Sequence, residues 1–155
     1  MNYISATQFL RQSKQVQDVF IKWWEPQYGD LFSWIKPSVA IEGYMQNGCS
    51  LQILDADNIS SLHSGNFEET CSNYNSCKDY YIPLLTETQL REFIEYKTEC
   101  KVEFDCCEGR GYTLYLYSFK QGKREYKYSP ISNLGFSLFE AYFQVACQIA
   151  EGNLK

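Results

Sequence analysis

Three strand-like runs in the last third of the chain restrict its fold more than any other feature. They cover residues 101–107, 111–119 and 123–128, and only very short turns separate them. Turns of this length can join only antiparallel neighbours, because a parallel connection needs a crossover of a dozen or more residues. In the middle run two sets of side chains alternate: Tyr112, Leu114 and Leu116 on one face, and Thr113, Tyr115 and Tyr117 on the other. Both sets are largely apolar or aromatic, so we expect a meander whose central strand is covered on both faces.

The last helix adds a second constraint, and we expect it to run from residue 133 or 134 to residue 151. Its polar positions form one narrow stripe, made by Glu140, Gln144, Gln148 and Glu151. A helix with so wide an apolar surface has to be nearly surrounded by protein. We therefore expect it to be the most buried helix and to pack on the sheet. A second copy of the chain could supply part of that cover, which leaves a homodimer open.

The other segments indicate two more helices, a hairpin and a long loop. Residues 5–24 and 86–98 have helical periodicity, and both begin with a capping-box pattern. Residues 39–45 and 49–54 flank an Asn-Gly pair, which is typical of tight hairpins. The stretch 57–79 is crowded with Ser, Asn, Asp and Glu, so we expect a long polar loop there.

Helices that interrupt antiparallel strands, without regular βαβ alternation, indicate an α+β fold. A length of 155 residues suits one domain. We expect a single domain over residues 1–155, with an antiparallel sheet (the hairpin plus the three-stranded meander) packed by three helices.

The charge of the chain is concentrated in its middle third. The net charge is −5, and residues 51–100 hold nine acidic against three basic side chains, a local balance of −6. Non-specific binding to nucleic acid needs a basic face that displaces counterions from phosphates, so we do not expect it here. An acidic surface is instead attracted to a basic surface on another protein, including one that itself binds nucleic acid.

The sequence favours a cytoplasmic protein. No apolar run approaches the roughly 20 residues needed to span a bilayer, and residues 1–10 lack the pattern of a secretory signal. The seven cysteines are odd in number and several lie in apolar segments, which suits free thiols in a reducing compartment. We expect no contact with a membrane.

No pattern in the chain predicts a catalytic centre. The single histidine, His63, could form a zinc site with Cys71, Cys77 and Asp79, but the spacing of these cysteines is not one that structural zinc usually shows. One histidine in a polar loop is also a poor anchor for a general base. We therefore predict no catalytic residues, no metal and no cofactor, and an activity based on binding.

Three groups of residues are candidates for binding. The first is acidic and lies at the start of the polar loop and within it: Asp55, Asp57, Glu68 and Glu69. The second is aromatic and would form a contact patch if exposed, or pack locally if not: Trp24, Tyr28 and Trp34. The third lies on neighbouring strands of the meander and could stack on a base and meet a phosphate: Tyr115, Tyr117, Tyr126, Tyr128, Lys123, Arg124 and Lys127.

Three helical stretches together carry a family resemblance: VQDVFIKWWEP at 16–26, PLLTETQLREFIE at 83–95 and LFEAYFQVACQIA at 138–150. They resemble small, mostly uncharacterised accessory proteins encoded in phages and prophages of Gram-positive bacteria. The resemblance covers about a third of the chain and includes neither the polar loop nor the Tyr-rich meander. It implies a genomic context, in which small proteins without enzymatic signatures are often inhibitors of host defence.

The leading hypothesis is therefore a non-enzymatic binding protein of a phage or prophage. It would act by protein–protein contact on a host protein, plausibly a nucleic-acid-binding defence effector, in the manner of an anti-CRISPR inhibitor. One alternative is a small-molecule or nucleotide-binding sponge that uses the Tyr-rich meander. The other is a metal-dependent enzyme that uses Asp55 and Asp57.

Overall fold

The computed structural model describes residues 2–25, 30–34, 52–53, 60–61 and 81–154. Helices and antiparallel sheets both occur in these residues, which confirms the predicted α+β class. The described strands form two separate antiparallel sheets, one of four strands and one of three.

The chain divides into two compact units. One is Ser5–Leu85, and the other combines Met1–Ile4 with Thr86–Lys155. We call them the N-terminal and the C-terminal unit. The single domain over residues 1–155 stays a prediction.

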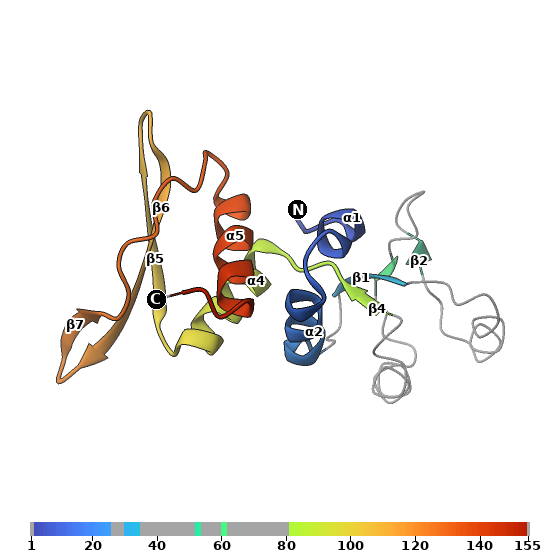
Figure 1. Cartoon of the computed structure of the whole chain (residues 1–155), viewed down its shortest axis with the longest axis horizontal. Helices are drawn as coiled ribbons and strands as arrows, with labels where there is room; N and C mark the ends of the chain where they lie inside the picture. Colours follow the sequence, from blue (N-terminus) through green and yellow to red (C-terminus); the bar gives the residue numbers. More distant parts are fainter. Residues whose placement is uncertain (1, 26–29, 35–51, 54–59, 62–80, 155) are drawn as a thin grey trace. The chain divides into compact units, whose positions relative to one another are not determined.

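The sheet of the C-terminal unit is the expected meander. Its strands are β5 (Lys101–Cys107), β6 (Gly111–Lys120) and β7 (Lys123–Tyr126), antiparallel and in that order. The register of β5 on β6 runs from Lys101 opposite Tyr117 to Cys107 opposite Gly111. Figure 1 shows this sheet with both helices of the unit on one of its sides.

The central strand β6 is paired along both of its edges. After β7 the chain continues along the same edge of β6, where Lys127 N–H donates to the Leu116 carbonyl (3.1 Å) and Leu114 exchanges two backbone hydrogen bonds with Ile131. Further on, Tyr112 N–H donates to the carbonyl of Gly135 (2.7 Å). Gly111 has a positive φ, and a Cβ there would collide with the Gly135 carbonyl, so the close return of the chain requires glycine.

Two helices cover one face of this sheet, α4 (Glu87–Thr98) and α5 (Leu138–Ala150). The predicted Thr86 capping box is present on α4, whereas α5 begins at Leu138 instead of residue 133 or 134, capped by Ser137. The start is later because the chain before it is still paired with β6. Of the described helices α5 buries the most residues, which confirms that expectation: Phe139, Ala141, Tyr142, Phe143, Val145, Ala146 and Ala150.

In the N-terminal unit, the segment predicted as one helix over 5–24 forms two, α1 (Ala6–Leu10) and α2 (Lys14–Trp23). The break has a local cause, because the Ser13 side chain accepts a hydrogen bond from Val16 N–H and so begins a new helix. The rings of Phe9 and Phe20 then pack together across the break, with centroids 6.3 Å apart.

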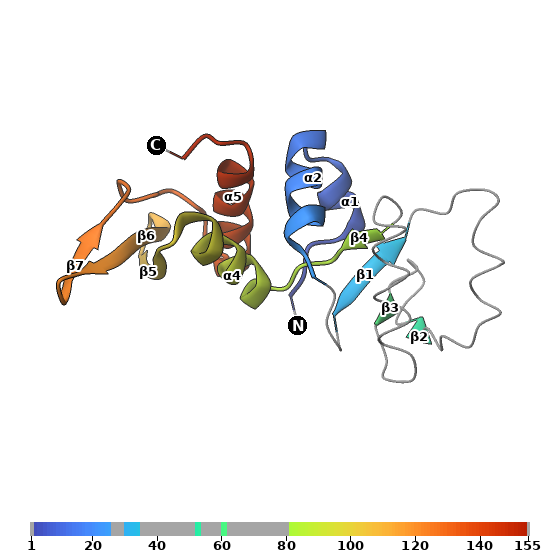
Figure 2. The same ribbon diagram turned by 90° about the horizontal axis from the view of Figure 1, so that it is seen from below.

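The sheet of this unit has the strand order β2-β3-β1-β4, with all pairs antiparallel (Figure 2). The strands are β1 (Leu31–Trp34), β2 (Gln52–Ile53), β3 (Ser60–Ser61) and β4 (Tyr81–Pro83). β2 lies in the predicted hairpin strand 49–54, and the other hairpin strand lies outside the described residues. β3 falls within 57–79, where the sequence predicts a loop, and pairing with both β1 and β2 makes these two serines a strand.

Candidate binding face of the C-terminal sheet

The two faces of the β5–β6–β7 sheet differ in what covers them. Side chains alternate along β6, so Leu114 and Leu116 face α4 and α5 and are buried, while Tyr115 and Tyr117 point the other way and are only half-buried. We call the first side the inner face and the second the outer face. Within the C-terminal unit the expectation that both faces are covered is therefore wrong, because α4 and α5 both lie on the inner side (Figures 1 and 2).

Four aromatic rings meet on the outer face. The register places Tyr117 opposite Tyr126 and Phe119 opposite Arg124. The ring centroids of Tyr126 lie 6.1 Å from Tyr115 and 6.3 Å from Tyr117, and those of Tyr117 and Phe119 are 5.6 Å apart. All three pairs are edge-to-face, an arrangement that stabilises aromatic pairs. Phe119 and Tyr126 are nonetheless 63% and 53% exposed, so the cluster presents apolar surface to solvent.

Arg124 holds this cluster in place. Its guanidinium carbon lies 4.2 Å from the centroid of the Tyr117 ring, and its Nη1 is 2.6 Å from Glu103 Oε2 on β5. Hydrogen bonding with the Tyr126 side chain, followed by the charge of Glu103, raises the pKa of Arg124 above its ordinary value. One cation therefore bridges all three strands, and its planar group extends the aromatic surface.

A groove of about 500 Å³ adjoins the outer face where the end of α4 meets the start of β5. Tyr117 and Phe119 form one side of it, and Tyr96 of α4, 69% exposed, lines the other. Glu95, Glu99 and Lys101 supply its charges. Aromatic walls with a few polar groups are typical of a surface that receives a side chain of a partner.

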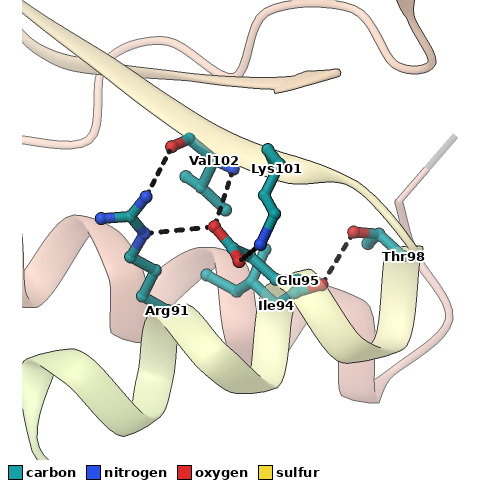
Figure 3. Close-up of polar contacts among 6 residues, drawn as sticks. All are labelled: Arg91, Ile94, Glu95, Thr98, Lys101 and Val102. Atoms are coloured by element: carbon teal, nitrogen blue, oxygen red, sulfur yellow. Dashed lines mark hydrogen bonds and ion pairs between the residues drawn. The ribbon is translucent and has the colours of Figure 1, made fainter. Parts of the chain in front are cut away.

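Glu95 fixes the wall of this groove by joining α4 to β5 (Figure 3). Its carboxylate accepts hydrogen bonds from Lys101 Nζ (2.6 Å), Arg91 Nε (3.2 Å) and the backbone N–H of Val102 (3.2 Å). Partial burial alone would raise the pKa of Glu95, but these donors outweigh it and lower the pKa below its usual value. The carboxylate is thus ionised near neutral pH and links the helix to the strand.

The structure brings together only part of the predicted Tyr-rich site. Tyr115, Tyr117, Tyr126 and Arg124 share the outer face. Lys127 does not join them, because its Nζ donates to the Thr98 carbonyl at the end of α4 (2.9 Å) and lies 5.8 Å from the Tyr128 ring. Alternation along β7 sets Arg124 and Tyr126 on the outer face and Lys123 on the other, and the strand ends before Lys127 and Tyr128.

Lys123 opposes Lys120 at the β6–β7 turn, away from the rings. Sequence reasoning missed Phe119, although it follows Tyr117 by two residues and so lies on the same face. It also missed Tyr96, which no pattern in the sequence connects to the meander.

The predicted aromatic patch and the predicted acidic group do not form a described surface. Trp24 is 3% exposed, packs on Phe32 with ring centroids 6.5 Å apart, and donates its indole N–H to Asp30 (2.9 Å). It is a core residue and not part of a contact patch, because Phe32 and Asp30 pack against it. Trp34 ends β1. The remaining candidates lie outside the described residues: Tyr28, Asp55, Asp57, Glu68 and Glu69.

Within the described ranges, no group of three or more His, Cys, Asp or Glu side chains is placed to hold a metal ion. The cysteines there are free: Cys106 and Cys107 are exposed and Cys100 is buried, whereas burial raises the pKa of Cys147 to about 12. None of the described helices has the length and hydropathy needed to cross a membrane.

Comparison with protein-family models, with curated proteins and with solved structures finds no match to this chain.

Proposed function

We propose that this protein acts by binding another protein through the outer face of its C-terminal sheet, without a chemical step of its own. The observation that carries the proposal is the cluster of Tyr115, Tyr117, Phe119 and Tyr126, half-exposed or exposed and held by Arg124. Tyrosine and arginine are the residues that most often dominate the free energy of protein–protein binding. Rings already in contact also lose little side-chain freedom when a partner arrives.

The charges around the cluster favour a protein over a nucleotide. A nucleotide site needs cations that can turn toward phosphate. Arg124 is paired with Glu103, and Lys127 is bonded to the end of α4. Glu95 and Glu99 line the adjoining groove and would repel a phosphate. The nucleotide sponge therefore remains the second hypothesis, supported by the three neighbouring tyrosines alone.

The wider role that we propose is the one suggested by the helical stretches 16–26, 83–95 and 138–150. The protein would be made by a phage or prophage, work in the cytoplasm of its bacterial host, and inhibit a defence effector by contact, as an anti-CRISPR protein does. Occlusion by contact requires no catalytic residues, only a rigid surface, and a sheet face braced by two helices supplies one.

A pair of matched variants tests the binding face. Phe119→Ala and Tyr126→Ala each remove an exposed ring of the cluster, and Phe136→Ala removes another exposed ring (71%), which makes no ring contact with the residues that the structure describes. Proteins captured from host lysate by the unchanged chain are quantified by mass spectrometry and compared among the variants. We expect a specific partner to lose affinity at least about tenfold with the first two and to be unaffected by Phe136→Ala.

A partner bound equally by all three variants would place binding elsewhere and contradict the proposal. A thermal-shift screen against nucleotides and cyclic dinucleotides addresses the sponge directly. A rise in melting temperature that Tyr126→Ala abolishes would favour it over protein binding. For the metal-dependent enzyme, activity that survives both Asp55→Ala and Asp57→Ala would exclude these carboxylates.

A further inference from the structure

β5 is an edge strand, and the hydrogen bonds of β6 show which of its backbone groups face away from the sheet. Its register on β6 sets Val102 opposite Leu116, Phe104 opposite Leu114 and Cys106 opposite Tyr112. Those three β6 residues direct their backbone bonds to the returning chain on the other side. The pairs are therefore non-hydrogen-bonded ones, and the N–H and C=O groups of these β5 residues point outward.

The outward groups of β5 are satisfied at one end of the strand and open at the other. At Val102, the N–H donates to Glu95 Oε1 (3.2 Å) and the carbonyl accepts from Arg91 Nη2 (3.4 Å), so α4 closes the edge there (Figure 3). Phe104 and Cys106 have no such partner among the residues described, and both side chains are exposed. The N–H and C=O groups of these two residues, in strand geometry, are therefore available to pair with a further strand.

The side chains beside this open edge differ between the two faces. Phe104 lies on the inner face, 46% exposed, with its ring 5.9 Å from that of Tyr112. Glu103 and Asp105 lie on the outer face by alternation, where Glu103 is paired with Arg124 and Asp105 belongs to no ion pair of the described residues. A strand added here would set its own alternating residues opposite an apolar row on one side and an acidic row on the other.

We propose that the open edge of β5, at Phe104 and Cys106, binds an extended segment of a partner protein by strand addition. The segment carries Lys or Arg opposite Asp105, and apolar residues opposite Phe104. A second copy of β5 fits poorly, because antiparallel pairing of two copies about Phe104 sets Glu103 against Asp105, and pairing about Asp105 sets that residue against itself. The proposal concerns the edge alone and does not rest on binding by the outer-face rings.

Labelled peptides of about six residues that alternate Lys with Val test the edge, with binding to the full chain followed by fluorescence anisotropy. Phe104→Pro removes one outward N–H without removing a bond to β6, and proline is tolerated at such an edge position. We expect this variant to weaken binding by about tenfold. N-methylation of the peptide on its bonding edge should abolish binding. Phe136→Ala, which removes an exposed ring outside β5, β6 and β7, should leave it unchanged.

A charge exchange makes the test independent of the stability of the proline variant. Asp105→Lys should weaken binding of the Lys-Val peptide and strengthen that of a matching Glu-Val peptide, which purely structural damage would not do. Equal binding of the N-methylated and unmodified peptides would overturn strand addition. Self-association that Phe104→Pro abolishes would show that the occupant is a second copy and would also overturn the proposal.

Discussion

The inner and outer faces of the C-terminal sheet are built from the same strands, yet they differ in burial. On the inner face, Val102, Leu114 and Leu116 are almost fully buried under α4 and α5. On the outer face, Tyr115 and Tyr117 are half-buried and Tyr126 is exposed, and their rings pack edge to face. The difference lies in residue type, since aliphatic side chains have to leave water whereas tyrosine is stable at a boundary.

The cover of the inner face is itself uneven. On β5, helix α4 covers Val102 and is hydrogen-bonded to it. Phe104 and Cys106, two and four residues further along this strand, are exposed. Along β5, the backbone edge and the inner-face side chains are therefore covered by α4 at Val102 and exposed a few residues later.

The largest effect is expected from opening the inner face. Leu114→Ala removes a fully buried side chain from the centre of the sheet and leaves a cavity, so the free energy of unfolding should fall by about 2–5 kcal/mol. Tyr126→Ala, on the other face, should lower it by no more than about 1 kcal/mol. Denaturant unfolding measures both, and equal losses would show that the outer face is also part of the core.

Thiol labelling should separate the covering helix from the uncovered end of the sheet. Cys147 of α5 has a pKa of about 12 because of its burial, so at pH 8 only about one molecule in ten thousand carries its thiolate. Cys106 and Cys107 are exposed at the end of β5. Alkylation of the folded protein, followed by peptide mass spectrometry, should modify these two far sooner than Cys147. Comparable rates would mean that α5 opens readily from the sheet.

A smaller effect is expected from Glu95, which marks the point where the helix cover meets the strand. Because the folded state lowers its pKa, the ionised carboxylate stabilises the protein above the ordinary carboxyl pKa, and this gain is lost as the pH falls through the lowered value. Glu95→Gln should therefore cost about 1 kcal/mol near neutral pH. The gap between variant and unchanged protein should close in acid. A gap that persists in acid would point to lost packing.

The sequence was informative about this unit and less so about its boundaries. Short turns and alternation predicted the meander and its central strand, because both depend on neighbouring residues. The start of α5 was misplaced, since the pairing of Ile131 with Leu114 depends on residues 17 positions away in the chain. The burial of Trp24 likewise depends on Phe32 and Asp30, which no local pattern connects to it.

In the candidate site, too, the features set by neighbouring residues were predictable and those set by distant residues were not. Alternation correctly grouped Tyr115, Tyr117 and Tyr126, and it would also have found Phe119. Alternation also sets position 127 on the opposite side from Arg124, but it could not supply the partner of Lys127, because that depends on the end of α4 lying within reach of the lysine. Contacts within a strand can be predicted from sequence, whereas contacts between a strand and a helix require the fold.

The smallest effect on stability is expected at Arg124, and it sharpens the comparison most. Arg124→Gln removes an exposed ion pair with Glu103, and solvent screens such a pair, so the free energy of unfolding should change little. Lys120→Gln is a matched control. The Lys120 ammonium also lies near a carboxylate, 4.0 Å from Glu125, but it stacks on no aromatic ring of the described residues. Because only Arg124 is stacked on Tyr117, its loss should loosen the rings and weaken partner binding, while Lys120→Gln leaves binding intact. If both substitutions reduce binding equally, net charge and not the ordered aromatic surface governs recognition, and the outer face differs from the inner one only in being uncovered.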